Sequence, residues 1–250
     1  MEDIKTLKDI HFVRNGIYSL FGIALRILPD KEHYDLLKKN FPILSKVAAE
    51  SGNKDMRKGF CGIKSFLSKR DKLFGKERDE YEMEALRRYT TLFCLKDSVP
   101  MEETFYTSGG RVESYDARDD MVRLMRKHNM HRSKDVTEYD DHISIELAFM
   151  AKLAEESMLC LEKTVNSEEG ATGYDALITE QIEFHKNHFN KWIKEFVKQT
   201  LKYNVDEKLF KPLLIFLRGF ISEDRRALEE MFLDIKCLGE IQPERYEYEN

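Results

Sequence analysis

A histidine surrounded by carboxylates is the most chemically capable group of side chains that the sequence places together. Residues 137–147 read Thr-Glu-Tyr-Asp-Asp-His-Ile-Ser-Ile-Glu-Leu. In a helix that begins at Glu138, His142 shares a face with Glu138 and Glu146, and Asp141 is its neighbour in sequence. A nearby carboxylate can hold the imidazole in one tautomer or raise its pKa. This arrangement suits the recognition of a peptide or another ligand.

The same stretch also has the features of an ordinary helix start. Thr137 followed by Asp140 resembles a capping box, and acidic residues in a first turn complement the positive end of the helix dipole. Helix starts commonly collect residues of these types. The pattern is therefore compatible with a binding role and with capping alone.

A metal centre is another use of these side chains. His185 and His188 lie on a later predicted helix and can join the first group. Di-metal sites in helical bundles use paired Glu-x-x-His motifs, and no histidine here follows a glutamate at that spacing. We therefore expect no metal and no cofactor. A helical-bundle metal-dependent enzyme stays open as the alternative, with these ligands: Glu138, His142, Glu146 and His188.

Motifs for nucleophilic catalysis and for phosphate binding are missing from the sequence. It contains no G-x-S-x-G, no G-x-x-x-x-G-K-[ST] and no G-x-G-x-x-G. Residues 108–111 (Ser-Gly-Gly-Arg) can form an anion-binding nest, but the sequence favours a flexible turn there. We expect a protein that is not an enzyme and does not bind nucleotides tightly.

The elements that position these residues are predicted to be helices. The 250 residues include only 12 Gly and 5 Pro, with 42% hydrophobic and 35% charged residues, which favours long uninterrupted helices around a core. Apolar residues recur every three or four positions along most of the chain. The expected helices cover residues 4–28, 31–49 (kinked or split at Pro42), 55–73, 76–95, 116–128, 138–163, 174–203, 206–221 and 223–237.

These patterns predict an all-α protein with a single-domain multi-helix bundle. The bundle is expected to span residues 1–238, followed by an acidic, loosely ordered tail at residues 239–250. Residues 96–115 lose the helical period and hold the only Gly-Gly pair. Long ordered loops of this kind are often functional, so we expect a binding surface there.

Charge and cysteine content restrict the partners and the compartment. The net charge is −5, which disfavours nucleic acid and favours a basic partner. The four cysteines are scattered singly, which fits a reducing cytoplasm. The first residues contain no apolar run of signal-peptide or membrane-spanning length. We therefore expect a cytoplasmic protein without stable membrane insertion.

Three blocks in the sequence resemble the TorD/DmsD/NarJ family of molybdoenzyme assembly chaperones, also called redox enzyme maturation proteins. Residues 89–93 (Tyr-Thr-Thr-Leu-Phe), followed by residues 99–100 (Val-Pro) and 104–106 (Thr-Phe-Tyr), are similar to its aromatic-x-x-Leu-Phe block. Residues 138–150 are similar to the signature E-P-x-D-H-I-x-x-E-L-x-F-M. Residues 184–196 resemble its F-x-x-x-H-x-x-x-W-x-x-x-F helix, with His188 and Trp192 at the family's positions.

The resemblance implies a TorD-like helical chaperone that is not an enzyme. Its partner would be an apo molybdenum-containing oxidoreductase subunit, held through its twin-arginine signal peptide or N-terminal segment while the molybdopterin cofactor is inserted, before export or assembly. The exposed carboxylates of residues 102, 103, 140 and 141 are expected to orient this basic peptide. The expected peptide-binding residues are Tyr89, Leu92, Phe93, Pro100, Glu102, Tyr106, Glu138, Asp141 and His142.

Two departures from the family pattern concern the expected site. Tyr139 stands where the signature has proline, so the first turn lacks a fixed φ. Residues 101–103 (Met-Glu-Glu) stand where relatives often carry Pro-Pro-aromatic, which suggests a different client. The client itself is not identified by the sequence, and the chain can be a monomer or a helix-swapped homodimer.

Overall fold

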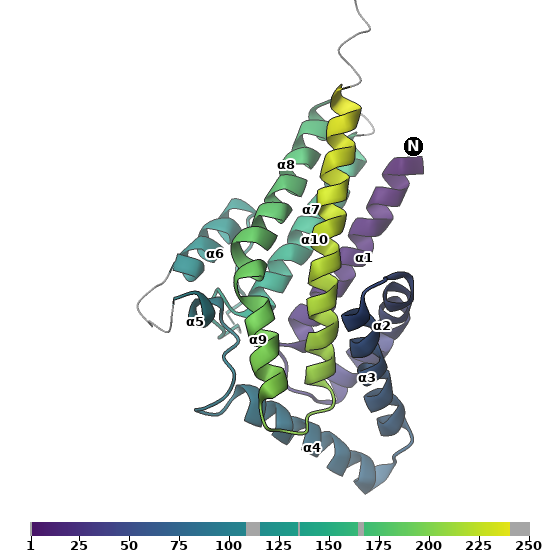
Figure 1. Cartoon of the computed structure of the whole chain (residues 1–250), viewed down its shortest axis with the longest axis vertical. Coiled ribbons are helices and arrows are strands. Elements are labelled where there is room, and N and C mark those ends of the chain that lie inside the picture. The colour runs from purple at the N-terminus through teal and green to yellow at the C-terminus, as the bar shows by residue number, and fades with distance from the viewer. Residues whose placement is uncertain (1, 109–115, 135, 165–167, 241–250) are drawn as a thin grey trace, which may run out of the picture.

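The computed structural model describes residues 2–108, 116–134, 136–164 and 168–240 (Figure 1). Most of these residues are helical, and the described part of the chain contains no β-strand. The predicted all-helical fold is confirmed. The helices are α1 (Glu2–Ala24), α2 (Lys31–Glu50), α3 (Lys54–Asp71), α4 (Gly75–Phe93), α5 (Glu103–Thr107), α6 (Asp116–Lys127), α7 (Ile143–Thr164), α8 (Glu168–Phe184), a π-helical turn η1 (His185–Phe189), α9 (Asn190–Lys202) and α10 (Phe210–Glu240).

The structure differs from the predicted helix boundaries in several places. α2 continues through Pro42 and is not split. α7 begins at Ile143, so the prediction of a helix start at Glu138 is wrong. The predicted helix 174–203 is interrupted by η1, and the two helices predicted over 206–237 form the single helix α10. The predicted loop 96–115 contains the short helix α5, and its residues 109–115, including the Gly-Gly pair and the possible anion nest, lie outside the described residues.

The long helices lie side by side along the long axis of the molecule (Figure 1). α1 packs along α7, α7 packs along α8, and α3 packs against α10. α4 lies across one end of this bundle, whereas α5 and α6 lie on one flank, where α5 contacts α9. The flank formed by α5, α6 and α9 therefore lies beside the core of the long helices.

Glycine lets α3 and α10 approach each other closely. A Cβ atom at Gly59 of α3 would lie 2.5 Å from the backbone nitrogen of Phe216, and one at Gly219 of α10 would lie 2.8 Å from the backbone nitrogen of Met56. Such distances are well below van der Waals contact, so only glycine permits this spacing. Gly219 lies inside α10, where it allows the close contact with α3 and does not interrupt the helix.

A buried ion pair joins the first and the last helix. Arg14 of α1 donates to Asp224 of α10 (Nη2 to Oδ2, 3.0 Å), and both side chains are buried. Tyr18 and His185 also donate to this carboxylate, at 2.7 and 3.0 Å. Burial opposes ionisation of Asp224, but the Arg14 charge and these hydrogen bonds outweigh it and hold its pKa well below the ordinary value. A buried charge with this many partners is a structural element of the core.

The C-terminal boundary differs from the predicted one. α10 continues to Glu240, so residues 239 and 240, which we assigned to the tail, are helical. Residues 241–250 lie outside the described residues. Within the described ranges, no helix is both long enough and apolar enough to cross a lipid bilayer.

Candidate functional site

Two segments that the sequence singled out separately meet in the structure. Residues 101–103 pair with residues 141–143 in a short antiparallel bridge centred on Glu102 and His142. The amide of Glu103 donates to the carbonyl of Asp141 at 3.0 Å, and the amide of Ile143 donates to the carbonyl of Met101 at 2.9 Å. The predicted loop is therefore attached to the start of α7.

Asp141 connects three helices from a buried position. Its side chain is 0% exposed. One carboxylate oxygen accepts a hydrogen bond from the amide of Thr104 in the first turn of α5 at 2.9 Å, and the other accepts one from Nε of Arg118 in α6 at 2.9 Å. The prediction of an exposed carboxylate is wrong for Asp141, because its oxygens bind these two helices to the start of α7.

His142 caps α7 in place of the predicted capping box. Its Nδ1 accepts a hydrogen bond from the amide of Ser144 at 3.2 Å, which satisfies one free amide of the first helical turn. Burial lowers the pKa of His142 to about 4, although the charges of Glu138 and Asp141 act in the opposite direction. The imidazole is therefore neutral near pH 7, and the expectation of a raised pKa is wrong.

Glu102 and Glu138 lie at the rim of this junction, and both are partly buried. One carboxylate oxygen of Glu102 accepts a hydrogen bond from the amide of Met101 at 3.0 Å. Burial, together with the nearby charge of Asp141, raises the pKa of Glu102. Glu138 lies before α7, so it does not share a helical face with His142 and Glu146.

The apolar residues expected to bind a peptide lie mainly in the core. Leu92 is 0% exposed and Tyr89 is 5% exposed. The Tyr89 ring lies 4.7 Å from that of Phe210, centroid to centroid, and the partly buried Phe93 packs on the same side chain at 6.1 Å. Burial raises the pKa of Tyr89. Tyr89 and Leu92 are therefore part of the core beneath the surface and are not themselves exposed to a ligand.

Pro100 and Tyr106 are two further residues expected to bind the peptide. The Tyr106 hydroxyl donates to the carbonyl of Pro100 at 2.8 Å, which closes the loop before α5. The Tyr106 ring stacks on Trp192 with a centroid distance of 5.4 Å. Both Pro100 and Tyr106 are partly exposed, so part of this surface can be reached by a ligand.

Two exposed aromatic residues beside this junction were not selected from the sequence. Phe105 is 49% exposed on α5, and Tyr139 is 56% exposed just before α7. The guanidinium of Arg118 lies over the Tyr139 ring, 3.8 Å from its centroid. Tyr139 replaces the proline of the family signature, and this difference is the feature of the sequence that could have identified it as a candidate site residue. No pattern in the sequence distinguishes the exposed Phe105 from its more buried neighbour Tyr106.

A second, fully buried group of polar side chains lies behind α5. Glu103 is 1% exposed, Glu146 is 0% exposed and His188 is 2% exposed. Nδ1 of His188 donates to Glu103 at 2.7 Å, and Nε1 of Trp192 donates to Glu146 at 3.1 Å. Burial, and then the charge of Glu103, raises the pKa of Glu146 well above its ordinary value. The expectation that Glu103 is exposed is therefore wrong.

The structure divides the predicted metal ligands. Glu146 and His188 come together, but Glu138 and His142 remain at the bridge, and Glu103 takes their place. His185 also faces elsewhere, toward Asp224. The π-helical turn produces this divergence, because it changes the angular spacing of the residues that it contains.

An acidic cavity of about 700 Å³ opens in front of the buried group, between α5, α6 and the start of α9. We call it the acidic cleft. Four carboxylates and two basic side chains, one arginine and one lysine, line it, so its net charge is negative. Its lining consists of Glu103, Thr107, Asp116, Ala117, Asp119, Asp120, Arg123, Asn187, His188 and Lys191.

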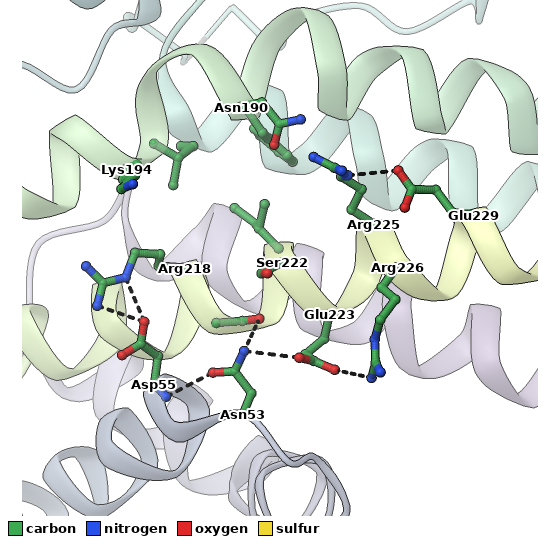
Figure 2. Close-up of a pocket in the computed structure, with 14 residues that line it drawn as sticks. Asn53, Asp55, Asn190, Lys194, Arg218, Ser222, Glu223, Arg225, Arg226 and Glu229 are labelled. Atoms are coloured by element: carbon green, nitrogen blue, oxygen red, sulfur yellow. Dashed lines mark hydrogen bonds and ion pairs between the residues drawn. The ribbon is translucent and has the colours of Figure 1, made fainter.

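Another cavity, of about 720 Å³, lies between the start of α3, α9 and α10 (Figure 2). Its charges are largely paired with each other. Arg218 binds Asp55 at 2.7 Å, and Arg225 binds Glu229 at 2.9 Å across one helical turn, as the dashed lines in Figure 2 show. Such pairs leave little net charge to select a ligand, so this cavity is a weaker candidate than the acidic cleft.

Sequence comparisons identify relatives of the chain. It is 23% identical to the chaperone protein TorD of Vibrio cholerae serotype O1 strain El Tor Inaba N16961, over 62% of this chain and 67% of that protein. It is 22% identical to the TorD of the Classical Ogawa strain O395 over the same shares of both chains. No solved structure matches the chain significantly.

Residues 51–198, more than half of the chain, match the family described as nitrate reductase delta subunit. The matched region begins just before α3 and ends within α9, so it includes the bridge, the buried carboxylates and the acidic cleft. Proteins of this family are chaperones of molybdoenzyme maturation and are not enzymes. The chain belongs to the nitrate reductase delta subunit family, which contains the TorD and NarJ chaperones.

Proposed function

We propose that this protein is a cytoplasmic chaperone that binds the twin-arginine signal peptide or N-terminal segment of an apo molybdenum-containing oxidoreductase subunit. It holds that segment while the molybdopterin cofactor is inserted, and releases it for export or assembly. The observation that carries the proposal is the acidic cleft, one wall of which is α5 with its exposed Phe105, on the flank where residues 101–103 and 141–143 meet. Membership of the chaperone family supports it.

The charge of the acidic cleft fits the basic part of such a peptide. Asp119 is exposed and Asp120 is half-buried, and both line the opening. Arginine prefers carboxylates that can accept two hydrogen bonds in one plane. An exposed ion pair contributes only about 0–1 kcal/mol. The carboxylates therefore set the orientation and the choice of peptide more than they set the affinity.

Apolar contacts must supply most of the affinity. Micromolar binding needs about 8 kcal/mol, and burial of one apolar side chain contributes about 1.5–3 kcal/mol. The exposed faces of Phe105, Tyr139 and the partly exposed Tyr106 are available for such contacts. Among the residues expected to bind the peptide, buried ones such as Leu92 and Asp141 act by positioning this surface.

Calorimetry of the full chain against synthetic twin-arginine leader peptides tests the proposal. Binding should weaken at least about tenfold when Phe105 is replaced by Ala, because a burial of this size is lost, and about threefold when Asp119 is replaced by Asn. The matched controls are Phe74→Ala, which removes an aromatic ring that is 74% exposed on α4's N-terminal side, and Asp79→Asn on α4. Equal losses in the controls, or no binding to any leader or apo-subunit, would refute the proposal.

The oligomeric state stays open between a monomer and a helix-swapped homodimer. The molar mass measured by light scattering as the protein elutes from a size-exclusion column distinguishes the two forms. In a helix-swapped dimer, the partner of Arg14 would come from the other chain, so the ion pair to Asp224 can form in either state.

A further inference from the structure

Three buried donor groups from separate elements converge behind α5. Glu103 comes from α5, Glu146 from α7 and His188 from the π-helical turn. One ligand atom from each lies within 4.8 Å of the other two. All three side chains are almost fully buried. Separate elements have thus brought two carboxylates and an imidazole to one point in the interior, where charge is costly unless it is neutralised.

One carboxylate oxygen in this group has no partner. Oε2 of Glu146 is oriented by Nε1 of Trp192 at 3.1 Å. Oε1 of the same carboxylate is buried, receives no N–H donor within the described part of the chain, and belongs to a carboxyl group that faces the carboxyl group of Glu103. A buried polar atom without a partner is rare in folded proteins and calls for an explanation. A cation between Glu103, Glu146 and His188 would supply the missing interaction.

The surroundings of His188 match those of a metal ligand. A metal-bound histidine usually donates its second ring N–H to a carboxylate, which fixes the tautomer. Nε2 of His188 lies 3.4 Å from a carboxylate oxygen of Asp120, whereas Nδ1 faces Glu103 at 2.7 Å. Trp192 orients Glu146 in the same way from the other side. The π-helical turn that carries His188 is a type of irregularity found often at functional sites.

A route for an ion is also present. Glu103 and His188 line the acidic cleft, so the buried group lies directly behind a cavity with several carboxylates. Such a cavity attracts cations and can provide a water molecule as a further ligand. Two carboxylates and one imidazole are ligands that Zn²⁺ accepts, and three protein ligands leave the fourth position of its tetrahedron open.

We propose that Glu103, Glu146 and His188 bind one divalent transition-metal ion of the Zn²⁺ class. The ion replaces the His188 proton that now faces Glu103 and connects α5, α7 and the π-helical turn. Because α5 forms one wall of the acidic cleft, the ion stabilises the shape of that cleft. The ion site adjoins the acidic cleft through Glu103 and His188, but it is inferred independently of the proposed peptide binding.

Zn²⁺ titration of the full chain, after treatment with a chelator and dialysis, tests this site. Calorimetry and elemental analysis should give one Zn²⁺ per chain with micromolar or tighter affinity. The near-isosteric changes Glu146→Gln and His188→Gln should weaken binding by more than about 100-fold, and Asp120→Asn by about 10–100-fold, the effect of losing an outer partner. The matched controls are His131→Ala and Glu138→Gln, on residues outside the group.

The thermal midpoint separates loss of the ion from loss of the fold. Zn²⁺ should raise the midpoint of the wild type and of both controls, but not that of Glu146→Gln. If a buried variant fails to fold, Asp120→Asn decides the question, because Asp120 is partly exposed. Three outcomes would overturn the proposal: no Zn²⁺ bound by the wild type, unchanged affinity in a folded Glu146→Gln or in Asp120→Asn, or binding that is lost with His131→Ala. The first outcome means that this group binds no ion, and the other two mean that Zn²⁺ binds elsewhere on the chain.

Discussion

Replacing Asp141 by alanine distinguishes a positioning role from direct contact with a client. The Asp141 carboxylate is 0% exposed and holds the amide of Thr104 and the guanidinium of Arg118, each at 2.9 Å. Alanine removes both acceptors while leaving the backbone bridge to Glu103 available. The change should therefore loosen α5 and α6 from the start of α7 without touching the exposed surface.

The expected loss of stability follows from these two contacts. A buried amide left without its acceptor costs about 1–3 kcal/mol. The pair with Arg118, whose side chain is 25% exposed, adds about 0.5–1 kcal/mol after screening by solvent. The sum is about 1.5–4 kcal/mol for Asp141→Ala. Asp141→Asn keeps an acceptor for Thr104 and loses only the charge, so it should cost about 1 kcal/mol.

Thermal unfolding followed by circular dichroism measures this difference. For a chain of this size, each kcal/mol shifts the midpoint by about 2–4 °C, so alanine should lower it by about 3–16 °C and asparagine by about 2–4 °C. The affinity of folded Asp141→Asn for a leader peptide should stay within about threefold of that of the wild type, because the lost charge is buried and does not contact the peptide. If Asp141→Ala is as stable as the wild type and yet binds no peptide, Asp141 contacts the client and our interpretation is wrong.

Three further predictions concern packing and pH. Gly59→Ala should lower the free energy of unfolding by about 1–3 kcal/mol, because its Cβ would lie 2.5 Å from a backbone nitrogen of α10. Gly16→Ala, whose Cβ would have no atom within 4 Å, should stabilise α1. Equal effects of the two changes in urea unfolding would contradict this prediction. The pKa of His142 falls from 6.5 to about 4 on folding, so unfolding takes up a proton between pH 6.5 and about 4. The free energy of unfolding therefore decreases as the pH falls through this range, by at most about 3 kcal/mol. His142→Gln should reduce this pH dependence in urea titrations at several pH values, and an unchanged dependence would count against the prediction. The effect of His128 on stability has the opposite pH dependence, because hydrogen bonds to Glu180 and Glu156 raise its pKa above 6.5. Its stabilising contribution is complete below pH 6.5 and is lost as the pH rises through the raised pKa. His128→Gln should therefore remove this loss of stability at higher pH, and an unaltered pH profile would refute the assignment.

The helical period predicted the fold because the pattern of apolar residues determines which faces can be buried. The ranges of α3, α4 and α6 agree with the sequence within a few residues. The start of α7 was misplaced because Thr137 and Asp140 carry the local signals of a cap, while the actual start depends on the bridge to residues 101–103. A contact between segments far apart in sequence leaves no periodic signal.

The candidate site was predicted in outline but not in its depth. The sequence linked the loop at residues 96–115 to the residues around His142 only through their joint resemblance to one family, and the structure joins residues 101–103 to residues 141–143. It did not show that Glu103 turns inward to meet His188, since a run such as Glu-Glu-Thr carries no sign of which side chain is buried. The π-helical turn was equally hidden, because its sequence continues the apolar pattern of a regular helix.

The ion pair between Arg14 and Asp224 has a consequence for the order of synthesis. These residues are 210 positions apart. At a synthesis rate of about 5–20 residues per second, α1 waits about 10–40 s before the carboxylate that neutralises Arg14 has been made. Until then α1 cannot settle into the core without burying an uncompensated charge. A nascent chain of this chaperone therefore completes its own fold only when its last helix has been made.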